Sequence, residues 1–258
     1  MEYEDHGHGP AVVLLHGQPG RGHNWSAVVS LLGGSARVLV PDRPGYGRSA
    51  GPAVGISANA DAVIALLDGV GVADGAIVAG HSWGGAVALD LARRYPARVR
   101  ALVLAGSVGG PGSIDGFDRV LGLPVLGPAL SLSALGALRL VATVRTPRVR
   151  RLVAPNAPDL IDHLSLDLWR EWHSFVVEQR AMLAELPAIA ADLARIAAPA
   201  TVLAGSNDRV VSPASQERLA ASLPAGRLVR LKGIGHLVPL EAPGVVADAV
   251  LTALAGTL

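Results

Sequence analysis

The chain lacks several residue types, and each absence excludes a class of protein. Its 258 residues include no cysteine, which excludes disulfide frameworks, thiolate metal sites and cysteine nucleophiles. Only 3% of the residues are aromatic and 17% are charged, with a formal net charge of +1. Lys232 is the only lysine, and the arginines are interspersed with acids, so the clustered basic face that binds nucleic acid is missing. No nucleic-acid partner is expected.

Long hydrophobic runs are scarce as well. The longest uncharged stretch, residues 120–138, is about long enough to span a bilayer, but glycines and prolines interrupt it. We expect a buried lid segment there, with a lid that touches a membrane as the alternative, and no stable membrane insertion. Residues 1–10 lack the basic stretch and apolar run of a secretory signal, which predicts a cytoplasmic protein.

The chain does contain the apolar residues of a large globular domain, which make up 50% of the sequence. Short apolar runs alternate with amphipathic segments of helical length. Fully buried strands are predicted at residues 11–15, 37–40, 76–79, 101–105, 200–204 and 227–231. Helices are predicted at residues 57–67, 82–95, 213–223 and 239–254. This alternation predicts an α/β fold with a mostly parallel central sheet flanked by helices.

The alternation of strands and helices stops between residues 109 and 199, where proline, glycine and helical patterns occur without strands. We therefore expect a core made of residues 1–110 and 198–258, with a helical cap, or lid, inserted at residues 111–197. Because exposed apolar patches often form interfaces, a homodimer through the cap is a candidate assembly.

A candidate nucleophile lies between a predicted strand and a predicted helix. Residues 80–84 read G-H-S-W-G, a G-x-S-x-G motif in the context where a sharp strand-to-helix turn projects the hydroxyl of Ser82. This turn falls at the carboxyl end of a strand, where parallel sheets bind their ligands. A serine that only caps the helix is the alternative, and the context favours the nucleophile.

A serine hydroxyl needs a base, and the base needs an orienting acid. Asp208 and His236 each follow a predicted strand, and the order serine, aspartate, histidine is the one that this motif's fold uses. A turn or cap role is the alternative for Asp208, but Ser212 already occupies the cap position of the next helix. A structural loop histidine is the alternative for His236. Asp115 and Asp118 are the rival acids.

Acyl transfer also needs backbone N–H groups that stabilise an oxyanion. One is expected from Trp83, which follows the candidate nucleophile at the N-terminus of a helix. The second is expected from Gln18, in the H-G-Q-P-G segment that follows the first clear strand. A simple strand-to-loop turn is the alternative for this segment.

These motifs, with P-D-R-P-G-Y-G-R-S at residues 41–49, resemble those of the α/β-hydrolase superfamily. The resemblance is to the cap-bearing branch of serine hydrolases, which includes esterases, lactonases, carbon–carbon bond hydrolases and cofactor-free haloperoxidases. It covers residues 11–110 and 199–244. Members have a strand pair before the His-Gly turn, whereas only residues 1–5 are available here, so a shortened N-terminal strand region is expected.

The resemblance also implies the roles of the site residues. It makes Ser82 the nucleophile, His236 the base and Asp208 the orienting acid. It makes the backbone amides of Gln18 and Trp83 the oxyanion donors. It implies neither a metal nor a cofactor.

Residue types exclude or disfavour other branches of the superfamily. Dehalogenases and epoxide hydrolases attack with a carboxylate where this chain has Ser82, and no tyrosine lies in the predicted cap. The aminopeptidase branch needs cap acids for a substrate ammonium group. Glu171, Glu178 and Glu185 are spaced by seven residues, which predicts one solvated helix face instead.

The composition of the cap predicts the substrate class. The cap is mostly aliphatic, which favours a small apolar substrate. Candidate substrate contacts are Trp83, Trp169, Trp172 and Phe175, although the helical spacing of the cap aromatics also fits packing inside the lid.

Other polar residues of the cap have open roles. His163 and His173 are candidate acid–base groups. A run of arginines would either recognise an acidic or CoA-linked substrate or form solvated surface: Arg145, Arg148, Arg150 and Arg151.

We therefore expect a serine hydrolase that cleaves an apolar ester, lactone or thioester. A carbon–carbon bond hydrolase or a biosynthetic cyclase is the alternative, since the same site can stabilise an enolate. A ligand receptor built on a hydrolase fold is the alternative from another class. Such receptors often lose part of the triad, whereas Ser82, Asp208 and His236 are all present here.

Overall fold

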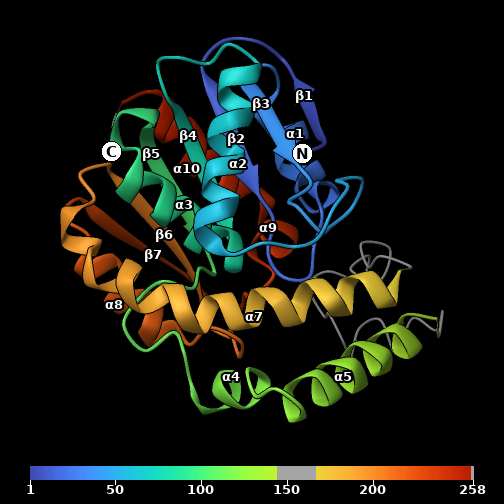
Figure 1. Cartoon of the computed structure of the whole chain (residues 1–258). Helices are drawn as coiled ribbons and strands as arrows, with labels where there is room; N and C mark the ends of the chain where they lie inside the picture. The colour runs from blue at the N-terminus through green and yellow to red at the C-terminus, as the bar shows by residue number, and fades with distance from the viewer. Residues whose placement is uncertain (144–166, 257–258) are drawn as a thin grey trace.

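A seven-stranded sheet forms the centre of the molecule, in the order β1-β3-β2-β4-β5-β6-β7 (Figure 1). The computed structural model describes residues 1–143 and 167–256. Only the β1–β3 pair is antiparallel among the strands of these residues. The strands are β1 (Tyr3–His6), β2 (Ala11–Leu15), β3 (Arg37–Pro41), β4 (Ala76–His81), β5 (Val99–Ala105), β6 (Ala200–Gly205) and β7 (Gly226–Leu231).

All six strands predicted as apolar runs form, with ends within two residues of the predicted ones. The α/β prediction is therefore confirmed, and the strand that precedes β2 in the chain is the four-residue β1. The prediction that residues 227–231 are fully buried is wrong. Because β7 is an edge strand, Arg227 and Arg230 are exposed and only Leu231 is fully buried.

Helices cover both faces of the sheet and bury separate apolar cores. One core joins α2, α3, α7 and α8 to the sheet, and the other joins α1, α9 and α10. Alternate residues of β2 serve the two cores: Val13 and Leu15 face the first, and Val12 and Leu14 face the second. The α-helices are α1 (Ser26–Leu32), α2 (Ile56–Gly69), α3 (Trp83–Arg94), α4 (Gly116–Leu121), α5 (Leu126–Thr143), α7 (Leu168–Ala191), α8 (Pro213–Ser222), α9 (Val238–Glu241) and α10 (Pro243–Leu254). Short 3-10 helices are η1 (Gly22–Trp25), η2 (Pro96–Arg98) and η4 (Leu193–Arg195).

The single helix predicted at residues 239–254 is wrong in one respect. The segment forms two helices, α9 and α10, with a break at Ala242, whose φ is −142°. Because Ala242 precedes Pro243, the proline ring disfavours helical backbone at this position. The helix α1 lay outside the predicted elements.

Helices α4, α5 and α7, which we call the inserted helices, lie between β5 and β6 in the chain. In Figure 1, the long α7 runs across the edge of the core with α5 beside it. The expectation of a buried segment at residues 120–138 is wrong, because Leu123, Val125 and Leu126 are exposed. Among the described residues, no helix has the length and apolar character needed to cross a membrane. The division into a 1–110 and 198–258 core and a 111–197 cap stays a prediction.

The environment of Glu171, Glu178 and Glu185 on α7 also differs from the prediction. Their seven-residue spacing does place them on one side of the helix, but that side is docked on the core. Glu178 is fully buried and Glu185 is half-buried. The prediction of a solvated face is wrong because heptad spacing defines a face without defining its environment.

Candidate active site

The turn between β4 and α3 places Ser82 at the carboxyl end of the central strand. Ser82 has φ of 52°, and no other non-glycine residue in the described part of the chain has a positive φ. Gly84 permits the turn, because a Cβ there would lie 2.8 Å from the Leu15 carbonyl carbon. Such a strained conformation persists only where the surrounding structure holds it, and it projects the side chain out of the turn.

His236 connects the serine to an aspartate. Its Nε2 lies 3.0 Å from Ser82 Oγ, and its Nδ1 lies 2.9 Å from Asp208 Oδ2. Because a carboxylate oxygen accepts, Nδ1 carries the proton and Nε2 is left to accept the serine proton. The structure thus brings together three of the residues singled out in the sequence, from the loops after β4, β6 and β7.

The Asp208 carboxylate is fixed by further donors. The backbone N–H groups of Val210 and Val211 each donate to Oδ1 at 2.9 Å, and Gln216 Nε2 donates to Oδ2 at 3.1 Å. Ser212 caps α8 as predicted, accepting from the Ser215 N–H at 3.2 Å. Gln216 was not predicted from the sequence, because nothing in its local pattern distinguishes it from other polar residues of α8.

Removing the hydrogen bond from Gln216 to Asp208 is expected to lower the activity. A Gln216→Leu variant keeps the volume but removes a hydrogen bond to a charged group, and we expect kcat/KM for esters to fall about tenfold. The matched control is Gln179→Leu, since Gln179 is also buried but donates to Asp118. Equal kcat/KM in Gln216→Leu and in the unmodified enzyme would show that the other donors suffice.

His81, which precedes the candidate nucleophile, is a second site residue that was not predicted from the sequence. Its Nε2 donates to the His236 carbonyl oxygen at 2.9 Å. Burial, followed by the nearby His236, lowers the pKa of His81 to about 3. His81 is therefore a neutral donor near neutral pH and anchors the loop that carries His236.

The lowered pKa of His81 predicts a loss of stability in acid. The unfolded histidine, with its ordinary pKa of 6.5, takes up a proton that the folded one excludes down to about pH 3. The free energy of unfolding therefore falls as the pH drops through this window, by at most about 1.4 kcal/mol per pH unit for this group. His81→Gln keeps an N–H donor but does not titrate, so urea denaturation across the window should show a shallower fall. An identical slope in both proteins would contradict the prediction.

The H-G-Q segment after β2, residues 16–18, lies directly against Ser82; we call it the oxyanion loop after the role expected of Gln18. A Cβ built on Gly17 would lie 3.0 Å from Ser82 Cβ and 2.8 Å from His81 Nδ1, so only glycine fits there. The candidate oxyanion donor, the backbone N–H of Gln18, belongs to the residue that follows Gly17. Trp83 begins α3, where the first amides have no partner within the helix.

The predicted substrate contacts have diverse environments. Trp83 is 1% exposed and packs in the core, with the Arg43 guanidinium 4.4 Å from its ring centroid. Trp172 Nε1 donates to the Pro128 carbonyl oxygen at 2.8 Å, which ties α7 to α5 and fits the lid-packing alternative. Trp169 is exposed, and Phe175 is half-buried.

The remaining candidates of the cap fall into two groups. His173 is exposed and makes T-shaped ring contacts with Trp169 and Trp172, with ring centroids 4.6 Å away in each case. The others lie outside the described residues: His163, Arg145, Arg148, Arg150 and Arg151.

The rival acids cap a helix. Asp115 accepts from the Asp118 N–H and Asp118 accepts from the Asp115 N–H, each at 3.0 Å, which forms a capping box at the start of α4. Within residues 1–143 and 167–256, no three acidic or histidine side chains are grouped as metal ligands.

Comparisons with known proteins agree with the α/β fold. A family model described as the alpha/beta hydrolase family matches residues 12–249. A magnesium-chelatase 30 kDa subunit of Rhodobacter capsulatus is 30% identical, over 96% of this chain and 88% of its own length. A pimeloyl-[acyl-carrier protein] methyl ester esterase of Aromatoleum aromaticum is 31% identical, over 91% of this chain and 94% of its own.

Among solved structures, a thermophilic esterase from Thermogutta terrifontis is similar with a TM-score of 0.77 and 25% identity. The match covers 99% of this chain and 93% of the esterase. The family and the esterases among these relatives support hydrolase activity. Because the family model matches most of the sequence, the chain belongs to the alpha/beta hydrolase family.

Proposed function

We propose that this hydrolase cleaves an apolar carboxylic ester, lactone or thioester through an acyl-enzyme on Ser82. The observation that carries the proposal is the hydrogen-bonded series Asp208–His236–Ser82, with contacts of 2.9 and 3.0 Å. The positive φ of Ser82 adds to it, since strained backbone conformations cluster at active sites.

The first half of the reaction forms the acyl-enzyme. Ser82 Oγ attacks the carbonyl carbon of the substrate while His236 Nε2 takes the hydroxyl proton. The carbonyl oxygen becomes an oxyanion that accepts from the Gln18 and Trp83 N–H groups. When the tetrahedral intermediate collapses, the bond to the alcohol or thiol breaks, and His236 returns its proton to that leaving group.

The second half releases the acid. Water gives a proton to His236 and its oxygen attacks the acyl carbon, and a second oxyanion forms in the same place. Collapse breaks the bond to Ser82 Oγ, which regains its proton. Asp208 stays ionised throughout and stabilises the imidazolium form of His236, while the N-terminus of α3 favours negative charge near Trp83.

The substrate class follows from the aliphatic character of the inserted segment and from the esterase relatives. We propose a small apolar substrate, with Phe175 of α7 as a contact near the site because its carbonyl oxygen accepts from the Gln18 side chain, and with no cofactor or metal. We also propose a homodimer that forms through α4 and α5, because these helices carry exposed apolar residues. The protein is proposed to act in the cytoplasm.

A panel of p-nitrophenyl esters of increasing acyl length tests the substrate class. We expect turnover, with kcat/KM that rises with chain length until the acyl pocket is filled. Turnover of none of these esters by folded protein would contradict the esterase proposal. In that case, activity on a vinylogous diketone would identify the carbon–carbon hydrolase alternative.

A further inference from the structure

A buried ion pair lies between the oxyanion loop and the inserted helices. Arg43 follows β3 and Glu178 belongs to α7, and their side chains are 1% and 0% exposed. Arg43 Nη1 bonds Glu178 Oε1, Nη2 lies 3.3 Å from Oε2, and the Tyr46 hydroxyl donates to Oε2 at 2.8 Å. Because burying two charges costs more than burying apolar groups of similar size, stability alone does not explain the pair.

The other donors of Arg43 are directed at the oxyanion loop. Nε donates to the His16 carbonyl oxygen at 3.0 Å, and Nη2 donates to the Gly17 carbonyl oxygen at 2.9 Å. The Arg43 backbone N–H donates to His16 Nε2 at 2.9 Å, and His16 Nδ1 donates to the Gly17 carbonyl oxygen at 2.9 Å. The Gly17 carbonyl therefore accepts from two side chains, one of them a buried cation.

The Gly17 carbonyl belongs to the same peptide unit as the Gln18 N–H. Because this unit is planar, the donors that fix the carbonyl also fix the direction of the N–H on its opposite side. A carbonyl that accepts from a cation is also polarised, which makes the linked N–H a stronger donor. Arg43 therefore orients and strengthens the proposed oxyanion donor without touching the reacting atoms.

A second contact links the same loop to α7. The Gln18 side chain donates from Nε2 to the Phe175 carbonyl oxygen at 2.8 Å. Phe175 and Glu178 lie about one turn apart on α7, so one stretch of this helix holds the loop both directly and through Arg43.

We propose that Glu178 is a positioning residue: from α7 it holds Arg43 in the orientation that fixes the Gln18 N–H. Docking of α7 on the core and assembly of the oxyanion hole are thereby coupled. The inference rests on the proposed function, because it takes the Gln18 N–H as an oxyanion donor.

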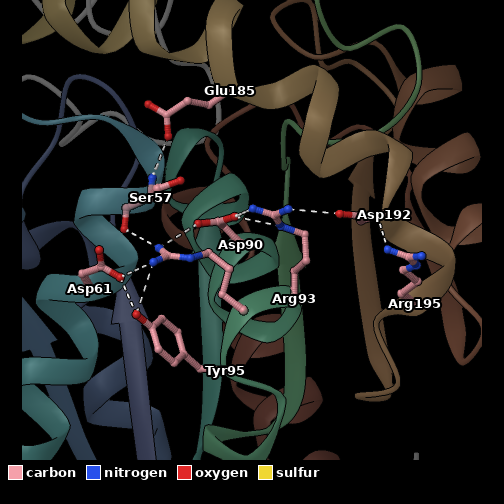
Figure 2. Close-up of polar contacts among 9 residues, drawn as sticks. Ser57, Asp61, Asp90, Arg93, Tyr95, Glu185, Asp192 and Arg195 are labelled. Atoms are coloured by element: carbon pink, nitrogen blue, oxygen red, sulfur yellow. Dashed lines mark hydrogen bonds and ion pairs between the residues drawn. The ribbon is translucent and has the colours of Figure 1, made fainter.

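Glu185 provides a matched control, one heptad further along α7. Its Oε2 accepts from the Ser57 N–H at 2.8 Å, at the start of α2 (Figure 2). Figure 2 also shows Arg93 bridging Asp90 of α3 to Asp192 just after α7, a contact that is independent of the oxyanion loop. Glu178→Gln and Glu185→Gln thus each remove one acidic contact between α7 and the core, but only Glu178 reaches the oxyanion loop through Arg43.

Steady-state kinetics with p-nitrophenyl butyrate test the proposal. Glu178→Gln should lower kcat about 10- to 100-fold and change KM less than about threefold, because the oxyanion forms only after binding. Glu185→Gln should stay within about threefold of the unmodified enzyme in both constants. Equal losses of kcat in the two variants would show that Glu178 only docks α7 on the core, and would overturn the proposal.

A double variant separates positioning from stability. Arg43→Met with Glu178→Met removes both charges, so the melting temperature lost in Glu178→Gln should be regained. The kcat should stay low, because the contacts to the His16 and Gly17 carbonyls are gone. Recovery of kcat together with the melting temperature would show that the pair acts only on stability.

A measurement that needs no turnover keeps this inference distinct from the proposed function. Amide hydrogen exchange in a peptide that covers residues 16–18 should become faster in Glu178→Gln and stay unchanged in Glu185→Gln. Unchanged exchange in both variants would overturn the positioning role. Absence of ester turnover in the unmodified enzyme would instead refute the proposed function.

Discussion

Replacing Ser82 by alanine is expected to lower kcat/KM for p-nitrophenyl esters by about 10⁴-fold or more. The reason is that the hydroxyl that lies 3.0 Å from His236 Nε2 is that of Ser82. The fold should persist, because serine and alanine experience similar strain at a φ of 52°. The measurement is steady-state kinetics together with the melting temperature.

Ser107→Ala is the matched control for this variant. Ser107 is also buried, but its Oγ donates to the Val108 carbonyl oxygen and not to a member of the triad. Ser107→Ala should therefore keep kcat/KM within about threefold of the unmodified enzyme. A Ser82→Ala protein that retained its activity would refute the acyl-enzyme mechanism.

Replacing Asp208 by asparagine is expected to lower kcat by about 10⁴-fold. The backbone N–H groups of Val210 and Val211 hold an oxygen at the Oδ1 position, so the asparagine NH₂ group must face His236 Nδ1. Nδ1 would then have to accept, which places the imidazole proton on Nε2. In that tautomer, His236 cannot take the proton of Ser82.

Asp115→Asn tests the rival acid under the same assay. Asparagine caps helices as well as aspartate does, so this variant should keep both its stability and its activity. Full activity in Asp208→Asn together with a large loss in Asp115→Asn would reverse the assignment of the acid.

Much of the sheet could be predicted because strands buried on both faces are continuous apolar runs, as in Ala11–Leu15. The exposure of the edge strand β7 was available from the sequence, because Arg227 and Arg230 interrupt its apolar residues. The helix α1 spans only seven residues, which is too short for a helical period to stand out. The break at Ala242 was available from the sequence, because Pro243 follows it directly.

The candidate triad could be predicted because each member follows a strand and the chain order is specific. Ser82, Asp208 and His236 therefore needed no knowledge of tertiary contacts. Arg43 and Glu178 could not be found in this way, since 135 positions separate them and neither lies in a local motif for an ion pair. Gln216 and His81 were missed for a similar reason: their roles depend on contacts with Asp208 and with the His236 carbonyl.

Labelling with a fluorophosphonate probe, followed by peptide mapping, tests the central claim most directly. An activated serine displaces fluoride and forms a stable phosphonyl ester, whereas an ordinary hydroxyl does not react. We predict one adduct per chain, on the peptide that contains Ser82, and its loss in His236→Gln. Folded protein that remains unlabelled, or an adduct on a different residue, would contradict the account.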